Sequence, residues 1–165
     1  MILGILADTH LDRLDGRLER LLAGELAGAE MILHAGDHTA ATVVDHLEYE
    51  DPRPYYGVGG NCDPDEVVRR LPALRLLEVE GFRIGMVHGY GPGSDLADRV
   101  PAMFPEVPDV IVFGHSHRPL IRRSEGILLV NPGSAFHPRG GPLGTVALLT
   151  ISGGSLDARL VEVAR

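Results

Sequence analysis

Cysteine is nearly absent from this sequence: the chain of 165 residues has one, Cys62. A single thiol cannot form a disulfide within the chain, which suits a reducing compartment, so we expect a cytoplasmic protein. The same scarcity excludes a structural zinc site built from several thiolates.

Long hydrophobic runs are missing as well. The apolar N-terminal stretch MILGILA meets Asp8 after seven residues and has no basic residue before it. It is too short for a membrane span, which needs about 20 apolar residues, and it lacks the pattern of a signal peptide. We therefore expect no membrane attachment.

Positive charge is also in short supply. The formal net charge is −8, whereas a surface for nucleic acid or anionic lipid needs a dense basic patch. We therefore expect no extended nucleic-acid surface. A small phosphorylated substrate held through metal ions is compatible with this charge.

What the sequence does contain is the composition of an ordinary globular domain. It is 44% hydrophobic and 23% charged, and this length suffices to bury a sizeable core. We find no linker, low-complexity tract or internal repeat in it. We expect one domain over residues 1–165.

Strands and helices alternate in the first half of the chain. Residues 1–7 read as a buried strand, and leucines at helical spacing predict a helix over residues 12–26. A strand at 31–35, a helix at 39–47 and a strand at 55–59 follow. This β–α–β repetition predicts a parallel sheet with right-handed crossovers.

The second half of the chain is richer in strands. After a short helical piece at 64–70, the stretch LRLLEVEGFRIGMVHG (74–89) predicts two strands joined by a tight Glu-Gly turn, which brings in antiparallel pairing. Prolines break a helical or irregular segment at 93–104. Further strands are expected at 109–113, 119–123, 127–130, 144–151 and 156–163. The predicted fold class is α/β, with two mixed sheets packed face to face and helices outside.

Side chains that can bind metal stand where the predicted strands end. The stretch VIVFGHSHRPL (110–120) runs from four apolar residues through a glycine into His115 and His117. In an extended chain, residues i and i+2 point to the same side, so the two rings should share one small volume. The same reasoning pairs Asp8 with His10. The full set at the strand ends is Asp8, His10, Asp37, Asn61, His88, His115 and His117.

Each of these residues taken alone has an ordinary explanation. An aspartate after a strand is more often a helix cap than a ligand, and a lone histidine is usually a hydrogen-bonded polar residue. Histidine is a poor cap, however, so capping does not explain two aspartates, an asparagine and four histidines at strand exits. In open α/β sheets, ligands bind outside the carboxyl ends of the strands, where loops converge.

The ligand types narrow the chemistry. Imidazole and carboxylate without thiolate suit Mn, Fe, Zn, Co or Ni. Seven ligands exceed what one ion with an open position needs, but they suit two ions that share a carboxylate. Two ions about 3.5–4 Å apart stabilise both the attacking and the leaving oxygen of a phosphoryl displacement. We therefore interpret the set as a centre for two divalent ions.

In these motifs the sequence resembles the calcineurin-like metallophosphoesterases. It is most similar to their small single-domain bacterial and archaeal branch, which is related to the retromer subunit of eukaryotes. The matching pieces cover nearly the whole chain in family order: D-T-H (8–10), G-D (36–37), G-N-C-D (60–63), H-G (88–89) and G-H-S-H (114–117). The resemblance implies a four-layer α/β/β/α sandwich of two mixed β-sheets flanked by helices.

The resemblance also implies a role for each ligand. Asp37 would bridge two divalent ions, and a hydroxide shared by them would attack phosphorus directly, first of all in a phosphodiester, with no covalent enzyme intermediate. Manganese is the expected metal, with Fe, Ni, Zn or Co as alternatives. The two implied ligand groups are Asp8, His10, Asp37 and His117 for one ion, and Asp37, Asn61, His88 and His115 for the other.

One position departs from the family pattern. Many members carry histidine after the motif asparagine, where it protonates the leaving group or steadies the transferring phosphoryl group; this chain has Cys62 there. A general acid contributes about 10²–10⁴ in rate, so without one, esters with good leaving groups should react far better. His38, directly after Asp37, is a candidate substitute, or else a solvated loop residue. The candidates for catalytic residues are Asp37, Asn61 and His38.

Other residues near the motifs carry further expectations. Cys62 as a nucleophile or redox switch is a minor alternative, because the metals already supply a nucleophile. We expect Asp63 to orient the neighbouring loops rather than bind metal. The loop NPGSAFHPRGG (131–141) should lie beside the site, where His137 and Arg139 either touch substrate or remain solvated.

The same fold leaves other functions open. The retromer relative shows that it can become a non-catalytic metal-binding scaffold or protein-interaction module. A metal-dependent sensor or nucleotide-binding module with vestigial turnover is a third possibility. A scaffold would be expected to lose ligands, and this chain keeps all seven, which favours catalysis. Apolar strand edges leave a homo-oligomer open.

Overall fold

Two β-sheets form the centre of the molecule. The computed structural model describes residues 1–164, and within that range ten strands form two five-stranded sheets. From edge to edge, sheet A consists of β10 (Ser155–Glu162), β9 (Thr145–Ser152), β1 (Ile2–Leu6), β2 (Met31–His34) and β3 (Tyr55–Gly57). Sheet B consists of β4 (Leu74–Val79), β5 (Phe82–Val87), β6 (Val110–Phe113), β8 (Ile127–Asn131) and β7 (Leu120–Ser124).

Both sheets are mixed. In sheet A, β1, β2 and β3 run parallel, β9 pairs antiparallel with β1, and β10 pairs antiparallel with β9. In sheet B, β5, β6 and β8 run parallel, while β4 and β7 pair antiparallel at the two edges. The carboxyl ends of the parallel strands therefore lie along one edge of each sheet, which is where loops can build a site.

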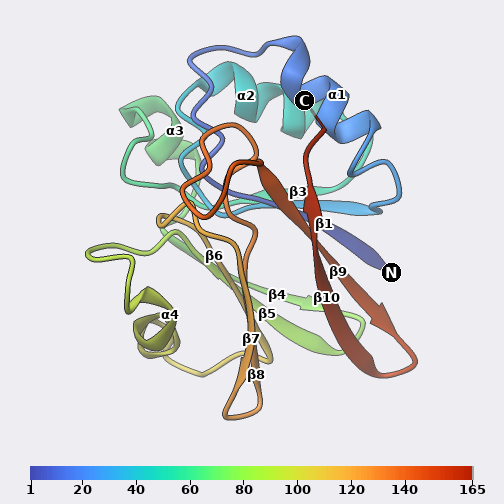
Figure 1. The fold of residues 1–165 in the computed structure, drawn as a ribbon, viewed down its shortest axis with the longest axis vertical. Coiled ribbons are helices and arrows are strands. Elements are labelled where there is room, and N and C mark those ends of the chain that lie inside the picture. The colour runs from blue at the N-terminus through green and yellow to red at the C-terminus, as the bar shows by residue number, and fades with distance from the viewer. Residues whose placement is uncertain (165) are drawn as a thin grey trace.

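Helices cover the outer faces of the two sheets, as Figure 1 shows. Sheet A is accompanied by α1 (Gly16–Ala23), α2 (Ala41–Asp45), the π-helical turn η1 (His46–Glu50) and α3 (Asp65–Arg70). Sheet B is accompanied by α4 (Leu96–Arg99) and the 3-10 turn η2 (Val100–Met103). Every helix in the described part of the chain is too short or too polar to cross a lipid bilayer.

Alternating side chains of the strands build a core on each face of each sheet. In β1, Ile5 is buried in the core between the two sheets, and Leu6 is buried in the core under α1 and α2. In β6, Val112 faces the core between the sheets, and Phe113 faces α4 and η2. The layers are therefore helices, sheet A, sheet B and helices, which confirms the predicted α/β fold class and the four-layer sandwich.

Helix α1 is shorter than the leucine spacing predicts. The sequence indicates a helix over residues 12–26, but α1 begins only after Asp15, whose Oδ1 accepts a hydrogen bond from the backbone N–H of Arg17 and caps the helix. Leu11 and Leu26 lie outside the helix and are nevertheless fully buried. The leucines therefore mark which residues face the core, in the loops as well as in the helix.

Removing a side chain from the core between the sheets should destabilise the whole domain. Leu33 on β2 is fully buried there, whereas Leu76 on β4 is 46% exposed. We expect Leu33→Ala to lower the free energy of unfolding by about 2–5 kcal/mol, because it leaves a cavity, and Leu76→Ala to lower it by less than about 1 kcal/mol. Urea denaturation measures both values. Equal losses would contradict the layered core.

Candidate metal centre

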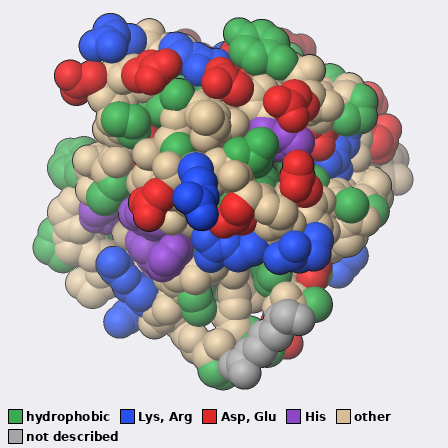
Figure 2. Space-filling view, turned by 90° about the horizontal axis from the view of Figure 1, so that it is seen from above, with side chains coloured by type: hydrophobic (Ala, Val, Ile, Leu, Met, Phe, Trp, Pro, Cys, Tyr) green, Lys and Arg blue, Asp and Glu red, His purple; other side chains and the backbone are tan. Residues whose placement is uncertain are grey.

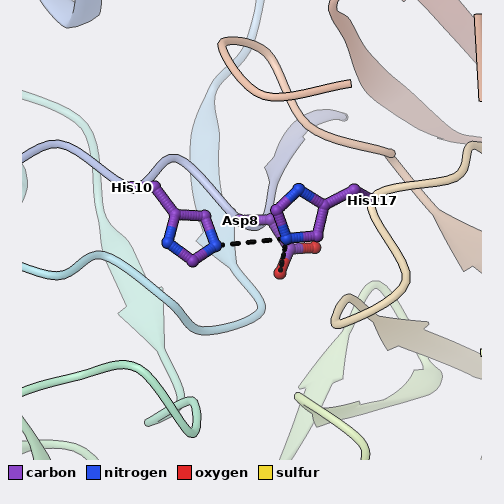
Figure 3. A group of neighbouring side chains, drawn as sticks. All are labelled: Asp8, His10 and His117. Carbon is purple, nitrogen blue, oxygen red and sulfur yellow. Dashed lines mark hydrogen bonds and ion pairs between the residues drawn. The ribbon is translucent and has the colours of Figure 1, made fainter. Parts of the chain in front are cut away.

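Loops from the two sheets meet at the carboxyl ends of the central strands. Asp8 and His10 follow β1 and His117 follows β6, yet the three side chains point toward one another (Figure 3). Nε2 of His10 lies 3.2 Å from Nε2 of His117, and the latter atom lies 3.6 Å from Oδ1 of Asp8. These three residues form a first group of candidate ligands.

A second group forms beside the first. Asn61 follows β3, His88 follows β5 and His115 follows β6. Oδ1 of Asn61 lies 3.1 Å from Nε2 of His88 and 2.9 Å from Nδ1 of His115. The amide nitrogen of Asn61 faces Sγ of Cys62 at 3.3 Å, so its oxygen is the atom turned toward the histidines.

Asp37, which follows β2, lies between the two groups. Its Oδ2 is 3.3 Å from Nε2 of His10 in the first group and 3.4 Å from Nε2 of His88 in the second. Its Oδ1 accepts a hydrogen bond from the backbone N–H of Cys62 at 2.8 Å. The structure thus brings together in one place all seven residues that the sequence singles out at the strand ends.

Backbone carbonyls fix the orientation of the imidazole rings. Nδ1 of His88 donates a hydrogen bond to the carbonyl of Ala35 at 2.7 Å, and Nδ1 of His117 donates one to the carbonyl of His137 at 2.7 Å. Because a carbonyl can only accept, the bonded nitrogen carries hydrogen, and Nε2 is left to face the site. Contacts of this kind are the usual support of a metal-binding histidine.

His115 shows why the site fits a cation. Its Nε2 donates to the carbonyl of Gly91 at 2.8 Å, which leaves Nδ1 to face Oδ1 of Asn61 at 2.9 Å. With its one ring hydrogen on Nε2, the imidazole meets the amide oxygen as a second acceptor. Two acceptors this close repel each other unless a positive charge lies near both. Within residues 1–164, the buried Oδ2 of Asp8 also has no hydrogen-bond partner. Imidazole, carboxylate and amide oxygen suit a divalent transition metal, and several triads of candidate ligand atoms lie within 4.8 Å of one another.

Five of these residues adopt a left-handed backbone conformation. The φ angle is 52° at Asp8, 46° at His10, 60° at Asp37, 66° at His115 and 56° at His117. Residues other than glycine rarely have positive φ, at a cost on the order of 1–3 kcal/mol each. The expectation of an extended chain at these pairs is therefore wrong: they lie in turns, and His115 and His117 point into different ligand groups.

Gly114 allows the two sheets to approach each other at this point. A Cβ on Gly114 would lie 2.8 Å from Cβ of Ala7 and 3.0 Å from Oδ2 of Asp8. Both distances are shorter than ordinary van der Waals contact, so a side chain here would push the loop after β6 away from the loop after β1. The residue between β6 and His115 must therefore be glycine.

Asp63 organises the loops behind the site, which confirms the role expected for it. Its carboxylate accepts hydrogen bonds from the backbone N–H groups of Asp37 at 3.1 Å, Gly60 at 2.8 Å and Thr39 at 2.7 Å. Burial alone would raise the pKa of Asp63, but the hydrogen bond and charge of His38 prevail and lower it to about 2. Asp63 is therefore a charged anchor that holds the loops after β2 and β3 together.

His38 is not placed for the role of a leaving-group acid. Its ring is fully buried and stacks on His34 with 3.7 Å between the ring centroids. Nδ1 faces Oδ2 of Asp63 at 3.3 Å, and Nε2 faces the hydroxyl of Tyr55 at 2.8 Å. Both nitrogens are thus engaged away from the ligands. Both expectations for His38, a substitute acid and a solvated loop residue, are therefore wrong.

Two polar residues, one at the end of β8 and one shortly after it, support the site, and sequence reasoning did not single them out. Nδ2 of Asn131 donates to the carbonyl of Gly114 at 2.8 Å, and Oγ of Ser134 donates to the carbonyl of Asp8 at 2.6 Å. Both side chains are fully buried. The signal that could have found them is a buried strand that runs directly into small polar residues, at the same edge as the ligands.

Comparison with known proteins identifies the family. Residues 1–154 match the model of the calcineurin-like phosphoesterase superfamily domain. The chain belongs to this superfamily. A "Probable metallophosphoesterase" of Methanothermobacter thermautotrophicus is 34% identical over 164 residues, which cover 98% of this chain and 92% of the relative. The resemblance of the motifs is thereby confirmed, and the family supports a metal-dependent phosphoesterase.

Solved structures of similar proteins share the fold over almost the whole chain. A Thermotoga maritima protein solved by NMR has a TM-score of 0.74 and 33% identity, covering 98% of this chain and 99% of that one. Vps29 of Chaetomium thermophilum has a TM-score of 0.71 and 21% identity, covering 99% of this chain and 97% of that one. The likeness to Vps29 shows the fold alone.

The ionisable groups of this phosphoesterase site differ in how they titrate. Burial raises the pKa of Asp8 to about 7. Burial also opposes ionisation of Asp37, but the hydrogen bond and charge of His88 prevail and hold the pKa of Asp37 well below its usual range. The same contact overcomes burial and raises the pKa of His88, whereas burial lowers the pKa of His10 and His117. Asp8 is therefore a group from which a metal ion must displace a proton near neutral pH.

Cys62 occupies the position where many family members have histidine. The residue is exposed at the edge of the site. Partial desolvation of the thiol and, to a lesser degree, the negative charge of Asp37 raise the pKa of Cys62 to about 11. A thiol that stays protonated at neutral pH is a weak nucleophile, and it gives up its proton reluctantly. This argues against Cys62 as a nucleophile or as an efficient acid.

Metal binding should weaken as the pH falls through 7. Below its pKa of about 7, Asp8 is protonated, and an ion has to displace that proton before the carboxylate can bind it. We expect the apparent affinity for Mn²⁺ to fall about tenfold for each pH unit below 7 per proton displaced. Calorimetric titrations at pH 6, 7 and 8, repeated in two buffers of different ionisation enthalpy, measure both affinity and proton release. Equal affinity at all three values, with no proton released, would contradict this account.

Proposed function

We propose that this chain is a phosphodiesterase that works with two divalent metal ions. The observation that carries the proposal is the position of Asp37, whose Oδ2 lies 3.3 Å from His10 Nε2 and 3.4 Å from His88 Nε2. A carboxylate between two ligand groups can serve an ion in each of them. Membership of the phosphoesterase superfamily supports the reaction class, hydrolysis of a phosphoric ester.

The donor set determines which ions suit the two positions. Manganese is the first candidate, and Fe, Ni, Zn or Co are alternatives, because the ligands are imidazole, carboxylate and amide oxygen. Bound there, the ions would activate water near neutral pH and offset negative charge on the phosphoryl oxygens. In this proposal Asp8, His10, Asp37 and His117 hold one ion, and Asp37, Asn61, His88 and His115 hold the other.

The protein's own contribution is to hold the ligands in position before a substrate arrives. Carbonyl groups orient the rings of His88 and His117, and Asp63 holds the backbone of Asp37. Removing such a contact typically lowers metal affinity or activity by 10–100-fold in metalloenzymes. The substrate's phosphoryl group therefore meets a set of donors that needs little rearrangement.

Space on both sides of the site favours a diester over a monoester. A pocket of about 270 Å³ adjoins Asn61 and His88 and includes Tyr90. A second pocket of about 470 Å³ adjoins His10 and His117. A phosphodiester has two substituents, and each ligand group opens toward room for one of them. The substrate we propose is thus a small molecule with a group on either side of the phosphorus.

The bridging role of Asp37 can be tested by its loss. We expect Asp37→Asn to weaken the binding of both ions together, because one charge serves both, and to abolish hydrolysis of bis-p-nitrophenyl phosphate with Mn²⁺. Metal content after dialysis and initial rates measure the two effects. Asp157→Asn is the matched control, since Asp157 is exposed on β10 and the same charge is removed.

Two outcomes would contradict this proposal. Loss of a single ion from Asp37→Asn, with the other retained, would show that the carboxylate does not bridge. A native protein that holds two ions but hydrolyses no phosphoric ester would favour the alternative, a metal-binding scaffold.

The residue at position 62 should determine which leaving groups are tolerated. We expect Cys62→His to raise kcat/KM for alkyl phosphodiesters by up to about 10²–10⁴, because these esters need a proton on the departing oxygen. Aryl esters with good leaving groups should gain far less. Cys62→Ser removes the thiol without adding an acid and should leave the ratio of the two rates unchanged. Equal gains on both ester types would mean that position 62 does not protonate the leaving group.

A further inference from the structure

A pocket beside the first ligand group contains residues that have no role in holding metal. Its volume is about 470 Å³, and it is lined by His10, Asp12, His117, His137, Pro138 and Arg139. Figure 2 shows a group of histidine side chains on the surface with basic side chains next to it. The pocket therefore has metal ligands on one wall and cationic or neutral donors on another.

The loop that carries Arg139 is fastened to the ligand His117. Nδ1 of His117 donates to the carbonyl of His137 at 2.7 Å, and the carbonyl of His117 accepts from the backbone N–H of Arg139 at 3.1 Å. The ring of His137 meets the ring of His10 edge-on, with 5.6 Å between the centroids. These contacts fix the backbone of Arg139 relative to the candidate metal ligands, so Arg139 has a defined position beside the site.

Arg139 lies beside the ligand groups without a counter-ion in the described chain. Six arginines within residues 1–164 pair with acids, as Arg53 does with Asp51 and Arg122 with Asp98, and several exposed arginines do not. The guanidinium of Arg139 makes no hydrogen bond and no ion pair with any residue in the range 1–164. Its positive charge acts, as the smallest of several contributions, against the burial that raises the pKa of Asp8.

A free cation beside a cation site is unfavourable unless an anion lies between them. Arg139 and two bound ions would repel one another, and only a negative group in the pocket turns that repulsion into attraction. The planar guanidinium matches the oxygens of a phosphate with two parallel hydrogen bonds. Asp12, the one carboxylate lining this pocket, would repel such a group, which places the anion at the Arg139 side.

We propose that Arg139, assisted by His137, binds a second phosphate on the part of the substrate that is not transferred. This inference rests on the proposed function and names its substrate class: phosphodiesters in which one alcohol carries a further phosphate, as in nucleoside bisphosphate esters and short oligonucleotides. Arg139 is then a specificity-determining residue, and the pocket beside His10 and His117 is its subsite.

Two esters with the same leaving group test this directly. Thymidine 5′-(p-nitrophenyl phosphate) and its 3′-phosphorylated counterpart both release p-nitrophenol and differ only in the second phosphate. With the Mn²⁺-loaded native protein, we expect kcat/KM to be about 10- to 100-fold higher for the phosphorylated ester, the range for hydrogen bonds to a charged group. In Arg139→Gln this ratio should fall to about one, and in Arg139→Lys it should take an intermediate value.

The control is Arg159→Gln, which removes the same charge from an exposed position on β10. It should keep the native ratio. Equal kcat/KM for the two esters in the native protein, or a ratio that survives Arg139→Gln, would overturn the inference while leaving the phosphodiesterase proposal in place. If Arg139→Gln and Arg159→Gln lost the preference for the phosphorylated ester equally, the preference would come from the net charge of the protein, and the inference would be overturned as well. Hydrolysis of neither ester would overturn both proposals.

Discussion

One carboxylate between two sets of histidines is the feature on which the site depends. Asp37 has a left-handed backbone conformation, and the buried carboxylate of Asp63 accepts hydrogen bonds from the backbone N–H groups of Asp37 itself and of Thr39. The imidazoles of His88, His115 and His117 are oriented by backbone carbonyls, whereas the ring of His10 stacks on that of His117. Without a cation, Nδ1 of His115 and Oδ1 of Asn61 face each other as two acceptors across 2.9 Å. The loops are thus built for a positive charge that the protein itself does not provide.

The sequence predicts the layers of the fold and the gathering of the seven strand-end residues, because both follow from strand order. Parallel strands of one sheet end at one edge, so polar residues after β1 and β2 had to meet, as did those after β5 and β6. Packing of the two sheets face to face then brings the two sets together. Conformation within the turns is a different matter. Positive φ at Asp8 and His115 comes from contacts across the two sheets, which no short stretch encodes. For the same reason His38, next to Asp37, could be read as exposed although it is fully buried.

The strained backbone of the site depends on the stability of the core beneath it. Five left-handed residues cost on the order of 1–3 kcal/mol each, and Asp8 is buried with an oxygen that finds no partner in the described chain. Neighbouring buried donors, among them Asn131 and Ser134, hold the loops in this arrangement. Strand residues only a few positions away, such as Ile5 and Val112, lie in the core between the sheets. The domain keeps a strained set of ligands because a well-packed scaffold stands directly beneath it.

The side-by-side placement of His10 and His117 has a mechanical consequence. These residues are 107 positions apart and belong to loops of different sheets, so an ion held by both would act as a reversible cross-link between the two sheets. A disulfide closing a loop of similar length stabilises a fold by roughly 4–5 kcal/mol in the chain-entropy model. Metal supply in the cell would then govern how long the folded chain survives proteases, in addition to whether it turns over a substrate.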